Sequence, residues 1–94
     1  DRILLVIYPN PATTLATVRC SLPSGVTELV LVIYGLGGDI VLRQELTAGQ
    51  VYVWNLLDAA GDRVGNGLYF CVVTATAAGG GSVRSDVFRL LIVR

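Results

Sequence analysis

The stretch Asp58–Val73, DAAGDRVGNGLYFCVV, constrains the fold more than any other part of the sequence. Its first half is a polar loop containing Gly61, Gly65 and Gly67, which permit the tight, positive-φ reversals that side chains oppose. Its second half, Leu68–Val73, is an unbroken run of apolar and aromatic residues that is typical of a β-strand. A strand this apolar must be covered on at least one face, so we predict that the chain forms a layered β structure around it.

The rest of the chain also divides into apolar segments of strand length, with turn signals about every 8–12 residues. The seven predicted strands are Ile3–Tyr8, Thr14–Leu22, Val26–Tyr34, Ile40–Leu46, Gln50–Trp54, Leu68–Ala77 and Arg84–Val93. No segment shows helical periodicity. This pattern predicts an all-β fold, a seven-stranded antiparallel β-sandwich of the Ig or fibronectin-III type, formed by residues 1–94 as one domain.

Composition excludes several classes of function. The seven basic residues are all arginine and are balanced by seven acids, so no basic surface for nucleic acid is predicted. No apolar run approaches the ~20 residues that a membrane-spanning helix needs. Histidine and lysine are absent, so no ordinary nucleophile–base pair can form, and we predict no enzymatic activity and no cofactor. The absence of methionine indicates a processed chain or a fragment.

Three motifs then occur in a fixed order: Tyr8-Pro9-Asn10-Pro11, Ser21-Leu22-Pro23 and Asn66-Gly67-Leu68-Tyr69-Phe70. With them the sequence resembles the Ig-like domain of the flagellar hook-capping protein, and it is similar to the C-terminal sorting domains of bacterial type IX secretion cargo. The resemblance implies a fibronectin-III-like sandwich at the C-terminal end of secreted proteins, outside the cell or on its surface. Such a domain would act without catalysis, by protein contact, as a sorting or anchoring module.

Cys20 and Cys71 fall on the second and sixth predicted strands, which face each other from opposite sheets in an Ig-type sandwich. Alternation places both side chains inward. We therefore predict a disulfide between them, which an extracellular location permits. The alternative is a pair of buried, reduced thiols that act as small hydrophobic residues.

The same alternation leaves apolar residues on the outer face of the third, sixth and seventh strands. Contiguous outward apolar residues usually mark an interface, whereas single exposed ones are common. The residues predicted to form this interface are Val30, Val32, Phe70, Val72, Val87, Leu91 and Val93.

Two alternative functions follow from particular segments. The first strand is apolar on both faces, so it could complete a neighbour's sheet by strand exchange and build a homo-oligomer or filament; its residues are Ile3, Leu4, Leu5, Val6, Ile7 and Tyr8. Trp54 and Tyr52 could instead bind a carbohydrate, although a lone tryptophan in a small sandwich is more often part of the core. Asn55, Asp58 and Asp62 could bind calcium, but their spacing favours capping of turns, and no metal site is predicted.

Overall fold

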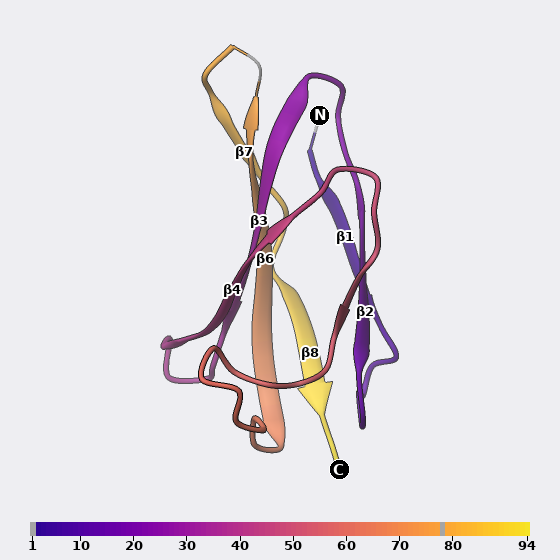
Figure 1. Cartoon of the computed structure of the whole chain (residues 1–94), viewed down its shortest axis with the longest axis vertical. Coiled ribbons are helices and arrows are strands. Elements are labelled where there is room, and N and C mark those ends of the chain that lie inside the picture. The colour runs from indigo at the N-terminus through magenta and orange to yellow at the C-terminus, as the bar shows by residue number, and fades with distance from the viewer. Residues whose placement is uncertain (1, 78) are drawn as a thin grey trace.

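The computed structural model describes residues 2–77 and 79–94, which form two antiparallel β-sheets packed face to face (Figure 1). The strands are β1 (Leu4–Tyr8), β2 (Ala16–Ser21), β3 (Val26–Tyr34), β4 (Ile40–Leu46), β5 (Tyr52–Trp54), β6 (Gly67–Ala77), β7 (Ser82–Arg84) and β8 (Phe88–Ile92). The described residues contain no helix, and therefore none that could cross a membrane. The predicted all-β, antiparallel class is confirmed.

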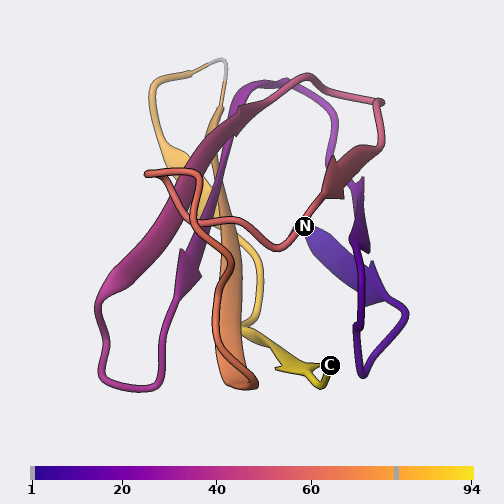
Figure 2. The same ribbon diagram turned by 60° about the horizontal axis from the view of Figure 1, so that its bottom comes forward.

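One sheet has three strands in the order β1-β2-β5, and the other has five, in which β4, β3, β6 and β7 follow one another and β8 also pairs with β6. Figure 2 shows the layer of β1 and β2 standing apart from the layer built on β3, β4 and β6. β6 is the centre of the larger sheet because it pairs with β3 along one edge and with β7 and then β8 along the other. The segment Leu68–Ala77 does organise the fold, as its composition predicted.

The described residues form eight strands rather than the predicted seven, because the predicted strand Arg84–Val93 is interrupted from Ser85 to Val87. The Ser85 backbone N–H donates to the Val73 carbonyl at 2.8 Å, and the Ser85 hydroxyl accepts the Val73 N–H at 2.9 Å. The hydroxyl takes the place of a backbone carbonyl in the ladder, so the strand can bend while the buried Val73 amide stays hydrogen-bonded.

The core lies between the sheets and is formed by alternate residues of most strands. Its largest fully buried members are Trp54, Ile3, Leu31, Ile33, Leu56, Leu90, Ile92, Val18, Val73 and Cys71. Trp54 of β5 meets Tyr69 of β6 edge to face, with ring centroids 6.4 Å apart. The Tyr69 hydroxyl donates to the Gly65 carbonyl at 2.6 Å, which is the arrangement of a tyrosine corner.

The segment after β1 seals the free edge of β8. The Asn10 side chain donates to the Arg89 carbonyl and accepts the Leu91 N–H, both at 2.9 Å. Ala12 then forms a parallel bridge with Ile92, in which its N–H and carbonyl bond Leu91 and Val93. This is the structural role of the motif at 8–11: it places an amide where another strand would otherwise pair, which protects the edge from strand addition.

Candidate interaction surface

Five of the seven residues that were predicted to form an interface lie on adjacent strands of the five-stranded sheet, whereas Val87 and Val93 flank β8. Val32 pairs with Val72 across β3 and β6, and Leu68 of β6 pairs with Leu91 of β8. The central residues of the set are less exposed than predicted. Val30, Val32 and Phe70 are half-buried, and Val72 is only 6% exposed, so neighbouring side chains of the same face already cover much of this stripe.

Charged residues border that stripe. Glu45 and Arg43 of β4 lie opposite Val30 and Val32, and Arg89 of β8 lies opposite Phe70. The exposed apolar members are at the β8 side of the sheet, where Val87, Leu91 and Val93 are 39–51% exposed. That these seven residues act together as an interface stays a prediction.

The most exposed row of large apolar side chains within a strand lies on the other sheet, along the strand that was predicted to take part in strand exchange. Along β1, Leu4, Val6 and Tyr8 are 55, 51 and 41% exposed, whereas Ile3 and Ile7 are buried and Leu5 is half-buried. Within a single chain this apolar strand is therefore covered on one face only: β1 is the outer strand of a three-stranded sheet and has solvent on its other face.

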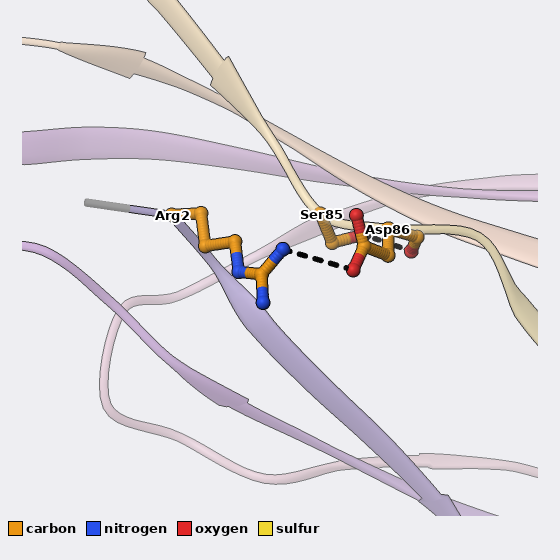
Figure 3. A network of polar contacts seen from close by, with 3 residues as sticks. All are labelled: Arg2, Ser85 and Asp86. Carbon is orange, nitrogen blue, oxygen red and sulfur yellow. Dashed lines mark hydrogen bonds and ion pairs between the residues drawn. The ribbon is translucent and has the colours of Figure 1, made fainter.

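β1 is also not free to be exchanged in this structure, because it already pairs antiparallel with β2 of its own chain, from Leu4↔Ser21 to Tyr8↔Thr17. The homo-oligomer or filament built by strand exchange has no support from this arrangement. Between β1 and β8 lies a groove of about 270 Å³ lined mainly by apolar residues of both strands. An ion pair, 3.2 Å long, joins Arg2, which precedes β1, to Asp86, which precedes β8 (Figure 3).

The predicted Cys20–Cys71 disulfide is absent, and both residues are free thiols. Their predicted inward orientation is correct, since Cys71 is fully buried and Cys20 is packed against the core from the edge. Cys20 lies opposite Leu5 of β1 and Cys71 lies opposite Phe88 of β8, each within its own sheet, and no bond joins the two thiols.

We expect two thiols per chain when the protein is denatured without reductant and titrated with a thiol reagent. In the folded protein Cys71 should react far more slowly than Cys20, because burial removes access and raises the pKa of the Cys71 thiol to about 12. Burial raises the Cys20 pKa as well. Burial penalises the thiolate form of Cys71 and not its neutral thiol form. The unfolded chain loses this proton near pH 9 and the folded chain only near pH 12, so the protein is expected to lose stability as pH rises from about 9 towards 12. A titre of fewer than two thiols would contradict this prediction.

Trp54 does not form the exposed platform that the carbohydrate hypothesis requires. It is 1% exposed, and its indole Nε1 donates to the Leu57 carbonyl at 2.8 Å. Tyr52, the other proposed residue, is half-buried and packs against the core. The alternative stated from the sequence, that Trp54 belongs to the core, is correct.

The polar loop 55–66 is held by its own hydrogen bonds. Asp58 Oδ1 accepts the N–H groups of Ala60 and Asp62 at 3.0 and 2.9 Å, which is the turn capping favoured from the sequence. In the part of the chain that the structure describes, no three His, Cys, Asp or Glu side chains are grouped to hold a metal ion. Arg94, which the sequence analysis did not single out, donates through its guanidinium to the carbonyls of Val64 and Leu56.

The comparisons with known proteins agree with the resemblance to sorting domains. The profile of the family described as "Secretion system C-terminal sorting domain" matches residues 6–79. No curated protein matches the sequence. None of these comparisons supports the hook-capping resemblance.

Two solved structures share the fold. The dimeric latent form of PorU from Porphyromonas gingivalis superimposes with a TM-score of 0.78 at 24% identity, over 97% of this chain and 9% of PorU. Pectate lyase Pel3 from Pectobacterium carotovorum superimposes with a TM-score of 0.65 at 9% identity, over 95% of this chain and 26% of Pel3. The chain therefore spans only a small part of each protein, and at these identities the likeness concerns the fold alone.

Proposed function

Since the chain belongs to the family of secretion system C-terminal sorting domains, we propose that it directs a protein joined to it through a type IX secretion machinery to the cell surface. It acts by protein contact and without catalysis. The family match carries this proposal, because residues 6–79 include most of β1 and all of β2–β6. The matched unit therefore takes in strands of both sheets, which favours recognition of the folded sandwich over recognition of a short linear signal.

The surface supports a role in contact. Large apolar residues are exposed on both outer faces, among them Leu4, Val6 and Val53 on the three-stranded sheet and Val87 and Val93 on the side of the five-stranded sheet. Exposed apolar groups of this kind are typical of surfaces that meet a partner. In the polar loop, the carboxylate of Asp58 caps its own turn. The sequence also contains no histidine or lysine to act as a base. Both observations support a role without catalysis.

The proposal is tested by joining residues 1–94 to the C-terminus of a periplasmic reporter in a bacterium that has a type IX system. We expect the reporter to reach the cell surface or the medium, as measured by its activity in fractionated cells. The bare reporter should stay in the periplasm, and so should the fusion in a strain whose secretion machinery is deleted. Retention of the fusion in the intact strain, with the sandwich shown to be folded, would refute the sorting role.

A further inference from the structure

The outer face of the three-stranded sheet carries a row of exposed apolar side chains on β1 beside a single positive charge on β2. We define it by the outward residues of its strands, namely Leu4, Val6, Tyr8, Thr17, Arg19, Ser21 and Val53. We propose that this three-stranded face docks a partner protein whose own surface is apolar and presents one carboxylate to Arg19. The inference rests on the proposed sorting function and names the surface that would perform it.

Arg19 lies at the middle of the face. It is on the central strand β2, directly opposite Val6 of β1. Its guanidinium Nη1 lies 3.4 Å from the hydroxyl of Tyr8, one row along the sheet. In that next row Thr17 stands between Tyr8 and Val53. Because Val6, Tyr8 and Val53 are 41–52% exposed, the charge is framed by apolar groups that a partner can bury.

Among the residues that the structure describes, the charge of Arg19 has no ion-pair partner. None of the face's residues is acidic, and Arg19 forms no ion pair with any residue that the structure describes. Arg2 differs, since it is paired with Asp86 at the edge of the sandwich. Burying an unpaired guanidinium in an interface is costly unless the partner supplies an anion. A partner that covers these apolar residues must therefore bring a carboxylate to Arg19.

A second copy of this chain does not satisfy that requirement. A two-fold dimer through the face would use the same patch on both copies. Since Arg19 is central, the two guanidinium groups would then lie near each other within a newly buried interface, and like charges so placed disfavour association. The charge pattern therefore favours a different protein, rather than a second copy of this chain, as the partner.

A lipid surface fits less well than a protein. Attraction to anionic lipid comes from clusters of several basic residues, each of which contributes a small part of the binding free energy. The face has one basic residue, and the chain as a whole has zero net charge. A flat sheet with one charge among apolar groups has instead the composition of a protein interface, in which arginine and aromatic residues are enriched and other charges are depleted.

The experiment uses the same reporter fusion with substitutions on each sheet. R19E reverses the central charge and Val6→Arg places a second charge beside it, and we expect each to lower export at least tenfold. R84E and Ile40→Arg are the matched controls on the five-stranded sheet, where both residues are exposed and lie outside the predicted interface, and they should export like the unchanged fusion. Arg19→Lys keeps the charge and should retain most of the export. Thermal melts of all variants establish that each is folded.

Several outcomes would overturn the proposal. Export of R19E and Val6→Arg at the unchanged level would remove the three-stranded face from recognition, while export of the parent fusion would leave the sorting role intact. Equal losses in the controls would show that the effect is not specific to this face. Sedimentation of the chain with anionic phosphatidylglycerol vesicles, abolished by R19E, would favour a lipid surface over a protein. Failure of the parent fusion to leave the periplasm would count against the sorting function itself.

Discussion

Replacing Trp54 with alanine is expected to destabilise the sandwich by about 3–5 kcal/mol, which is the usual cost of deleting a large buried aromatic side chain. Trp54 is 1% exposed and is the main contact of the short strand β5 with the opposite sheet, through Tyr69. The substitution also removes the donor to the Leu57 carbonyl. Because domains of this size are stabilised by only about 5–15 kcal/mol, a loss of this size brings the chain close to unfolding.

Urea denaturation followed by circular dichroism measures this effect, since Trp54 is the only tryptophan and its fluorescence is lost with it. Trp54→Phe is the matched control. It keeps an aromatic ring in the core and loses the indole N–H and part of the ring volume, so we expect less than half the destabilisation. A cost below about 1 kcal/mol for Trp54→Ala would mean that the tryptophan does not join the two sheets as described.

Replacing Ser85 with alanine is expected to cost about 1–3 kcal/mol, which is the penalty for leaving a buried amide without a partner. Ser85 is 4% exposed, and its hydroxyl accepts the N–H of Val73 and donates to the Asp86 carbonyl at 2.9 Å. Figure 3 shows Ser85 beside Asp86, at the break between β7 and β8. Without the hydroxyl, the Val73 amide in the centre of the sheet has no acceptor at this break.

Two measurements separate this effect from a general loss of packing. Hydrogen exchange of the Val73 amide should accelerate in Ser85→Ala more than exchange of amides elsewhere in β6. Ser82→Ala makes the same substitution at an exposed position of β7, and it should change the stability by no more than about 0.5 kcal/mol. Unchanged protection of Val73 in Ser85→Ala would show that another group accepts its N–H.

Much of the fold could be predicted where apolar and polar residues alternate. Val18 and Cys20 point inward on β2 while Arg19 points out, as the alternation required. The start of β6 after the glycine-containing loop was also predictable, because glycine permits backbone conformations that other residues rarely adopt. In the structure Gly67 does have such a conformation, with a φ of 146°. The break at Ser85 was not, because one serine in an apolar strand does not show that its hydroxyl will bond a neighbouring strand.

The candidate surface was harder to predict than the fold. A continuous apolar run such as Ile3–Tyr8 contains no alternation that distinguishes its two faces. Outward apolar residues could be identified only on strands with clearer alternation, so the interface was predicted on β3, β6 and β8. In the structure Val72, one of these outward residues, is only 6% exposed. Exposure depends on which strand becomes the outer one and on how large its neighbours' side chains are, and both follow from the order of strands.

The sequence by itself determined the class of the fold, the inward residues of the alternating strands and the family, because these depend on local periodicity and on short motifs. Only the tertiary structure decided that Cys20 and Cys71 remain separate thiols and that the exposed side chains of Leu4, Val6 and Tyr8 lie in a row beside Arg19. These outcomes depend on distances between strands that are far apart in the chain. The order and spacing of the sheets set those distances, and no local pattern of residues specifies them.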